Sequence, residues 1–182
     1  IPVIVTHAHR DVPGTIIKKE DKHMESVLVR GITINESEAK INLHQVPDRP
    51  GVAAEVFGIL DKSFVNVDMI VQTASTEATT DISFTVSEDD MATAVEAMGK
   101  LKETIGYGGL TWDDNIVKVS VVGVGMRSKR GVAATVFQTL ATENINIQMI
   151  STSEIKISCI IEKKYGKTAV QSLHSAFQLD KA

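Results

Sequence analysis

A turn at residues 46–53 places an acidic side chain just before the expected start of a helix. Its sequence is Val-Pro-Asp-Arg-Pro-Gly-Val-Ala, and the first backbone amides of the following helix have no partner within that helix. This end of a helix carries partial positive charge that suits a carboxylate, whereas the carboxylate of Asp48 suits an ammonium group. A free α-amino acid requires both kinds of receptor, so the turn indicates an amino-acid site.

The same turn is also compatible with a purely structural role. Asp48 as an N-cap, Pro50 in the first helical turn and Gly51 as a steric necessity would describe any stable helix start. Asp68 and Gln72 share one face of a later strand and could add polar contacts to a ligand. Spacing alone leaves both interpretations open.

Other patterns give weaker support for chemistry. Gly123 and Gly125 follow a strand but lack the third glycine and the distant acidic residue of a dinucleotide site, so we expect a turn. His7 and His9 could share a metal on one strand face, yet the spacing suggests no further ligand. Cys159 falls on an apolar strand face, where a free cysteine acts as a small hydrophobe. We therefore expect neither a catalytic site nor a metal.

Composition argues against several classes of protein. Of the 182 residues, 43% are hydrophobic and 23% charged, so the chain can bury a core. The net charge of -4 and an aromatic content of 4% disfavour nucleic-acid binding, including RNA on the strands of a ferredoxin-like sheet. No apolar stretch approaches the roughly 20 residues that span a bilayer. With a single cysteine, the chain is expected to be cytoplasmic and free of membrane contact.

An internal repeat at an offset of 80 residues defines the architecture. Residues 51–60 reappear as residues 131–140 with seven of ten positions identical, and residues 66–70 reappear as 146–150 with three of five identical. Each copy predicts a first strand, at 39–46 and at 117–124, followed by a turn and an amphipathic helix. Two more strands follow the helix, at 66–74 and 80–86 in the first copy. In the second copy the expected buried face of these strands consists of Ile155, Ile157, Cys159 and Ile161.

The first copy continues with a helix that starts near Ser87, expected as its N-cap, and with room for a fourth strand within 103–111. The order βαββαβ is that of a ferredoxin-like domain. The second copy lacks its fourth strand, and the alternating segment 25–33 is the candidate to supply it. We predict an α+β protein with domains at 39–112 and 113–182, the second discontinuous and completed by residues 25–38.

Several of these segments resemble a known family. The turn and helix at 47–54 resemble an ACT domain, a ferredoxin-like module that senses small molecules. Residues 119–128 and 144–158 closely resemble the C-terminal regulatory region of aspartokinase. The resemblance implies that residues 1–24 are the end of a catalytic domain and a linker. It also implies a chain without kinase activity of its own, because the part that would hold ATP and Mg is absent.

The resemblance further implies a regulatory role. Aspartokinases phosphorylate the β-carboxylate of aspartate with ATP and are feedback-inhibited by end-product amino acids. Asp48, Gly51, Ala53 and Gln72 match positions that contact threonine, within a turn that also contains Arg49, Pro50 and Val52. Asn146 and Ile147 match positions lent by a partner chain, which implies a homodimer with effectors at ACT–ACT interfaces.

Asp68 and Ser153 match positions that bear on lysine sensing. Lys129, Arg130 and Ala133 depart from some relatives, so a lysine site has less support than a threonine site. The alternative is a free-standing amino-acid sensor that regulates another biosynthetic enzyme.

Overall fold

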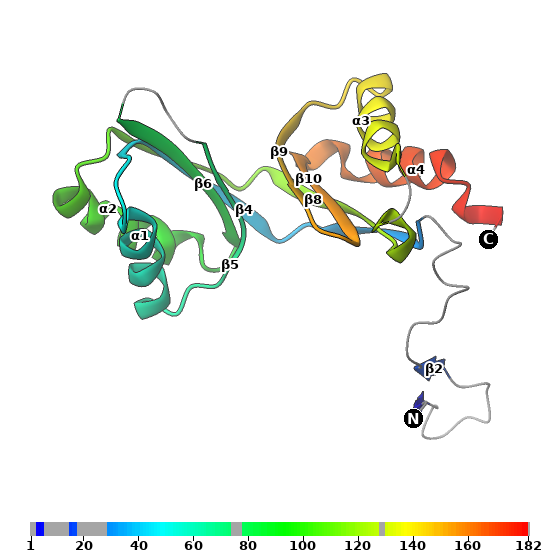
Figure 1. Ribbon diagram of the computed structural model, residues 1–182, viewed down its shortest axis with the longest axis horizontal. Helices are drawn as coiled ribbons and strands as arrows, with labels where there is room; N and C mark the ends of the chain where they lie inside the picture. Colours follow the sequence, from blue (N-terminus) through cyan, green and yellow to red (C-terminus); the bar gives the residue numbers. More distant parts are fainter. Residues whose placement is uncertain (1–2, 6–14, 18–28, 74–77, 128–129, 182) are drawn as a thin grey trace.

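The computed structural model describes residues 3–5, 15–17, 29–73, 78–127 and 130–181, which form two α+β domains and a small hairpin. In the hairpin, β1 (Val3–Val5) pairs with β2 (Thr15–Ile17). It lies apart from both domains, on the side of the second (Figure 1). No helix in these described ranges is long and apolar enough to cross a bilayer. His7 and His9 lie outside the described residues.

The first domain follows the predicted order βαββαβ. It contains β4 (Glu38–Pro47), α1 (Val52–Lys62), β5 (Val67–Gln72), β6 (Thr79–Ser87), α2 (Met91–Ile105) and β7 (Gly109–Asp113). The antiparallel sheet has the order β5-β6-β4-β7, and both helices cover one of its faces. The inward side chains of β4 and β6 pack against α1 and α2, and Phe84 meets Phe57 edge to face at 5.7 Å.

The second domain repeats this plan with one strand taken from earlier in the chain. It contains β8 (Ile116–Val122), a 3-10 turn η2 (Val124–Arg127), α3 (Val132–Thr142), β9 (Ile147–Thr152), β10 (Lys156–Glu162), η3 (Lys163–Tyr165), α4 (Gly166–Ala176) and η4 (Leu179–Lys181). Strand β3 (Gly31–Asn35) pairs with β8 and gives the sheet order β3-β8-β10-β9. The predicted completion of this domain by an N-terminal strand is therefore confirmed, although the strand begins at Gly31.

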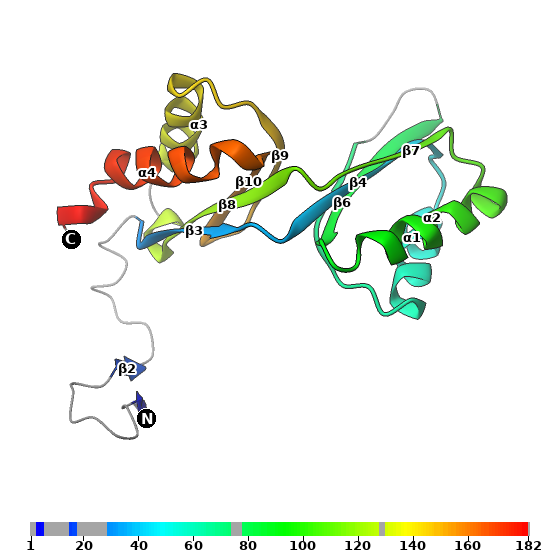
Figure 2. The same cartoon turned by 180° about the vertical axis from the view of Figure 1, so that it is seen from behind.

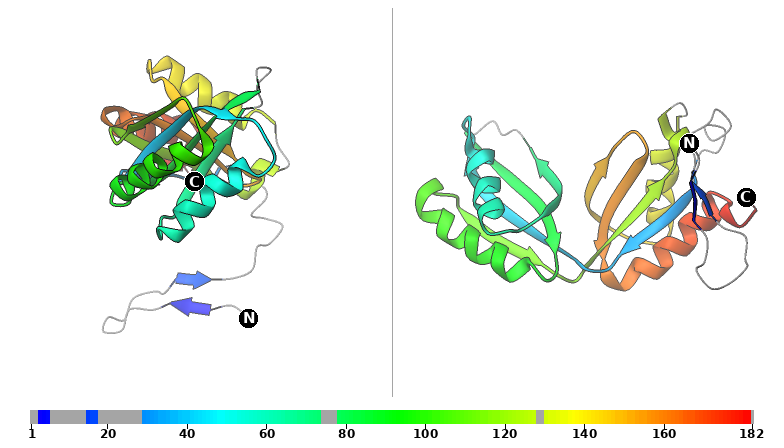
Figure 3. Two further views of the ribbon diagram at one scale, coloured as in Figure 1. Left: turned by 90° about the vertical axis from the view of Figure 1, so that its left-hand side faces the viewer. Right: turned by 90° about the horizontal axis from the view of Figure 1, so that it is seen from below.

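The two domains share a long antiparallel ribbon. Strand β3 passes into β4 through Glu36 and Ser37, and β7 passes into β8 through Asp114 and Asn115. Because β4 pairs with β7 and β3 pairs with β8, the two connections cross between the domains side by side (Figure 2). The helices lie on the outer sides, and the open sheet faces look toward each other across a V (Figure 3).

A small apolar cluster closes the base of this V. It contains Met69 and Met149, which are equivalent in the repeat, together with Ile116 and Ile160. Their burial ties β5 of the first domain to the sheet of the second. At the same point the buried hydroxyl of Thr85 accepts a hydrogen bond from the Met69 amide at 3.2 Å, which satisfies an amide freed by an irregularity in the β5–β6 pairing.

Two sequence predictions need correction in detail. The helix α2 begins at Met91 with Asp90 at the N-cap position, so Ser87 lies one turn earlier. Its hydroxyl accepts from the Asp90 amide at 3.2 Å and donates to the Asp90 carboxylate at 2.8 Å. Ile155 is exposed because it sits in the turn between β9 and β10, whereas Ile157, Cys159 and Ile161 are buried as expected.

Gly51 and Gly131 start the two equivalent helices with φ of +93° and +96°. An added Cβ at Gly51 would meet no neighbouring atom, so the expected steric need for glycine arises from its left-handed backbone and not from crowding by other residues. A left-handed backbone costs a non-glycine residue roughly 1–2 kcal/mol.

We expect replacement of glycine by alanine to have opposite effects on the free energy of unfolding at Gly51 and at Gly58. Gly51→Ala should lower the free energy of unfolding by about 1–2 kcal/mol. Gly58→Ala, in the middle of α1 where the added methyl also has open space, should raise it by up to about 1 kcal/mol. Urea unfolding of both variants checks this, and equal effects would contradict the conformational explanation.

Candidate ligand-binding site

The turn before α1 leaves the start of the helix without a side-chain cap. Gly51 occupies the N-cap position, and no side chain hydrogen-bonds there, so the interpretation of Asp48 as an N-cap is wrong. The Val52 amide reaches the Arg49 carbonyl at 3.3 Å, and the Glu55 amide reaches the Gly51 carbonyl at 3.0 Å. The amides of Ala53 and Ala54 have no acceptor among the described residues and remain available to a ligand anion.

Asp48 lies beside this helix start with its carboxylate exposed. Its backbone amide is fixed by the Ala78 carbonyl at 2.9 Å, while its side chain has no hydrogen bond or ion pair within the described ranges. The neighbouring Arg49 guanidinium forms a two-pronged pair with Glu55, at 2.7 and 2.9 Å. This side-chain hydrogen bond raises the pKa of Arg49 and lowers that of Glu55. Arg49 is thereby directed away from Asp48, which keeps a free negative charge.

The two other polar site residues predicted in the first domain, Asp68 and Gln72, lie toward opposite ends of β5. Gln72 pairs across the sheet with Ile82, and Ile82 with Leu43, so Gln72 lies toward the end of the sheet that holds the turn. Asp68 lies at the opposite end, at the base of the V, where it forms an ion pair with Lys118 of the second domain. The structure therefore groups Gln72, but not Asp68, with the end of the sheet that carries Asp48.

The three residues predicted from the second domain do not reach this turn within one chain. Asn146 and Ile147 lie at the end of β9 that pairs with Ile161, close to the base of the V, and Ser153 lies in the turn at the other end of β9. Strand β4, whose ten residues span about 30 Å, separates the base of the V from Asp48. A site built from Asp48 and Asn146 together requires a second chain.

Sequence reasoning missed a charged cluster at the base of the V. Lys118 on β8 donates to both Glu38 on β4 and Asp68 on β5. Burial alone would lower the pKa of Lys118, but hydrogen bonds to the two carboxylates outweigh it and raise the pKa. A signal was available, because Lys118 lies on the strand face opposite the apolar Val117 and Val119, and the alignment of 39–46 with 117–124 places it at the position of Lys40, a second lysine on that face.

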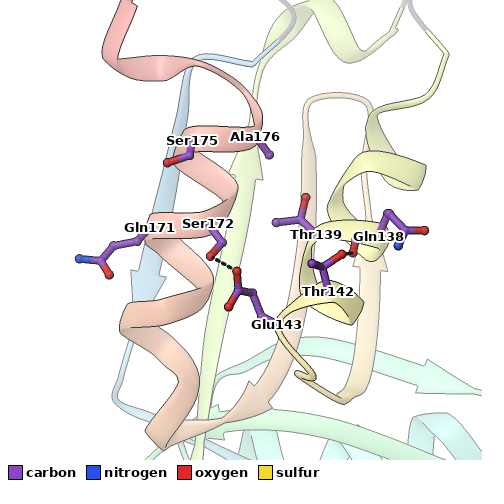
Figure 4. A pocket seen from close by; sticks show the side chains of 8 residues that line it. All are labelled: Gln138, Thr139, Thr142, Glu143, Gln171, Ser172, Ser175 and Ala176. Atoms are coloured by element: carbon purple, nitrogen blue, oxygen red, sulfur yellow. Dashed lines mark hydrogen bonds between the residues drawn. The ribbon is translucent and has the colours of Figure 1, made fainter.

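A separate groove of about 620 Å³ lies between α3 and α4 on the outer face of the second domain. Residues with hydroxyl side chains, such as Thr139 and Ser175, line it together with Ala176, and the carboxylate of Glu143 accepts a hydrogen bond from the Ser172 hydroxyl at 2.9 Å (Figure 4). None of the predicted site residues lines this groove. Among the described residues, no three His, Cys, Asp or Glu side chains are grouped to hold a metal ion.

This fold, repeated twice along the chain, is that of tandem ACT domains. The ACT domain model matches residues 44–100 and 119–177, which covers both halves of the repeat. Among curated proteins, the chain is 48% identical over 182 residues to the aspartokinase of Pseudomonas aeruginosa. The aligned region covers 99% of this chain but only 44% of that protein, so the chain spans less than half of this relative's length.

Solved structures give the same result. A crystal structure of aspartokinase alpha and beta subunits is 48% identical, covers 83% of this chain and 99% of the matched chain, and superposes with a TM-score of 0.79. The ligand-free regulatory subunit of aspartate kinase from Thermus thermophilus is 39% identical, covers 82% of this chain and 99% of its own, with a TM-score of 0.78. The chain therefore belongs to the aspartokinase family, as the regulatory portion that consists of two ACT domains.

The buried thiol gives a direct test of the packing of the second domain. Cys159 is 2% exposed, and burial raises the pKa of its thiol to about 11. Since only the thiolate reacts, Cys159 in the folded chain should react with a disulfide reagent at pH 8 roughly a hundredfold more slowly than in urea. Stopped-flow absorbance measures both rates, and equal rates would place Cys159 at the surface.

Proposed function

We propose that this chain is the effector-sensing part of an aspartate kinase, with threonine as the effector and lysine as a second candidate. The observation that carries this proposal is the turn before α1, where free helix amides stand beside the free carboxylate of Asp48 in an ACT domain. The α-carboxylate of an amino acid would accept hydrogen bonds from the Ala53 and Ala54 amides. Its ammonium group would pair with Asp48.

Side-chain selectivity would come from groups around this pair of receptors. Gln72 is exposed on β5, toward the end of the sheet that carries the turn. Its side-chain amide can both donate a hydrogen bond to the threonine hydroxyl and accept one from it. Pro50 and Gly51 set the turn. Val52 is buried under it and holds the helix start against the core.

We further propose that two chains assemble through their ACT domains to complete each site. Asn146 and Ile147 would come from the partner chain, because β4 separates them from Asp48 within one chain. Strands β5 and β9 are at sheet edges, and each exposes an isoleucine at the same position of the repeat, Ile70 and Ile150. Apolar, unpaired edge strands favour pairing with another chain.

Regulation would follow from differential binding. An effector shifts an equilibrium only if it binds one arrangement of the dimer more tightly than another. A coupling of about 1–3 kcal/mol between the effector site and a catalytic domain would suffice to inhibit phosphorylation of aspartate. In this proposal ATP and Mg bind only to that catalytic domain, and the described chain contributes the sensor.

Threonine should raise the melting temperature of the chain. At 100 times its dissociation constant a ligand stabilises the fold by about 2.7 kcal/mol, which is a shift of several degrees for a protein of this size. Asp48→Asn should abolish most of the shift, whereas Asp61→Asn, which removes the same charge from the exposed far end of α1, should preserve it. Differential scanning fluorimetry with threonine, lysine and aspartate measures this. A full shift in Asp48→Asn would contradict the proposed ammonium receptor.

The dimer should depend on the β5 edge. Ile70→Lys places a charge on that edge and should shift the chain from dimer toward monomer. Trp112→Lys alters an exposed large side chain on β7, at the opposite edge of the same sheet, and should leave the dimer intact. Light scattering after gel filtration gives the mass of each variant, and dissociation only in Trp112→Lys would place the interface at the other edge.

A further inference from the structure

A β-bulge lies in β4 immediately before the turn that leads into α1. The register of the β4–β6 pairing shifts between Leu43 and Val46, so that two residues of β4 lie opposite one residue of β6. The two residues are His44 and Gln45, and the single residue is Asp81. Leu43 and Val46 are both fully buried although they are three positions apart, which regular strand alternation would not allow. The bulge therefore sets which residues enter the turn.

The Asp81 carboxylate bonds to both residues of the bulge. One oxygen accepts a hydrogen bond from the Gln45 backbone amide at 2.9 Å, and the other lies 3.1 Å from Nδ1 of the His44 ring. These bonds, the one from Gln45 first, hold the pKa of Asp81 below its usual value. An ionised carboxylate can only accept, so Nδ1 of His44 carries a proton, and Nε2 faces the Thr111 hydroxyl at 3.0 Å. Asp81 thus connects β6 with both β4 and β7.

The bulge holds Gln45 in a backbone conformation that the residue would not favour by itself. Its φ is +53°, in the left-handed region that residues with a Cβ rarely adopt. The Gln45 side chain lies against Gly108, where an added Cβ would come within 2.9 Å of the Gln45 Cβ. The Gly108 amide in turn donates to the His44 carbonyl at 2.8 Å. Hydrogen bonds from two neighbouring strands therefore maintain the bulge.

The backbone transmits the position of the bulge to the turn over a short distance. Residues 46 and 47 pair with residues 80 and 79, and the Asp48 amide donates to the Ala78 carbonyl at 2.9 Å. Only three residues separate Gln45 from Asp48, a span of at most about 11 Å. A change of register at the bulge would therefore also move Asp48.

The second domain reaches its equivalent helix without such a bulge. Strand β8 pairs with β10 in one register from Ile116 to Val122. The chain then passes through Gly123 into the 3-10 turn η2. The bulge is thus a property of the first domain and not of the repeated fold, which associates it with the turn that carries Asp48.

We propose that Asp81 is a positioning residue for the amino-acid site, because it fixes the bulge and the bulge fixes the Asp48 carboxylate relative to the start of α1. The proposal rests on the proposed function, since it assumes that the ammonium group of a ligand pairs with Asp48. Asp81 does not contact the ligand in this proposal. Its two oxygens are already engaged by Gln45 and His44.

The test removes the acceptor and then supplies a backbone that does not need it. Asp81→Ala should lower the affinity of the 182-residue chain for threonine about tenfold in calorimetry, the scale of one hydrogen bond to a charged group. Hydrogen exchange of the Asp48 amide in the unliganded chain, followed by NMR, should become faster by a similar factor. Asp81→Asn keeps an oxygen for the Gln45 amide and should lose less than about threefold in affinity.

A second substitution distinguishes positioning from a general loss of stability. Adding Gln45→Gly to Asp81→Ala should restore most of the affinity and of the Asp48 protection, because glycine adopts a positive φ without support. Ser83→Ala, two residues along the same face of β6, is the control and should change neither quantity by more than about twofold. Asp81→Leu, with similar bulk and no acceptor, replaces Asp81→Ala should that variant fail to fold.

The outcomes separate this inference from the proposed function. Unchanged threonine affinity in the variant without an acceptor would overturn the role of Asp81 and leave the effector site intact. Losses that Gln45→Gly does not restore would overturn it as well, because they would reflect a general weakening of the sheet. If the unaltered chain binds no threonine, the proposed function fails, and exchange of the Asp48 amide alone then decides whether Asp81 holds the turn.

Discussion

The ribbon formed by β3–β4 and β7–β8 is the constraint on which the rest of the structure depends. Its two connections cross between the sheets at neighbouring points, so neither domain can complete its sheet without a strand that continues into the other. This continuity places the open sheet faces opposite each other and brings Met69 against Met149. A motion of one domain must therefore bend the ribbon or disturb the cluster at the base of the V, which gives ligand binding in one domain a physical route to the other.

The same constraint divides the predicted site residues between two ends of the molecule. Asp48 and Gln72 lie at the end of the first sheet farthest from the ribbon crossing, whereas Asp68 and Asn146 lie beside it. A ligand that joins residues from both groups has to join two chains. In such an arrangement the binding energy is available for holding one relative position of the chains, which is the requirement for a ligand that shifts a conformational equilibrium.

The repeat made most of the fold predictable, because it reported the same strand, turn and helix twice. The alternation of Ile41 and Leu43, and of Val119 and Val121, identified the inward strand faces, and the missing last strand of the second copy pointed to a segment before the first. Details set by tertiary contacts were not predictable. Ser87 lies a turn before its helix, and the N-cap of the first helix is Gly51 and not Asp48. The roles of the site residues and the assignment of residues 1–24 to a catalytic domain stay predictions.

The polar residues of the open sheet faces show why the candidate site was harder to predict than the core. Strand periodicity assigns Glu38 and Lys118 to the face away from the helices, where solvent is the default neighbour. Only the crossing of the ribbon brings that face against another sheet, and burial then converts two ordinary surface charges into a pair with 4% and 12% exposure. Such a pair contributes little net stability, since desolvation opposes its attraction, but it fixes which partner each charge can accept. The charges at the base of the V are therefore better understood as a constraint on how the two sheets meet than as a source of stability.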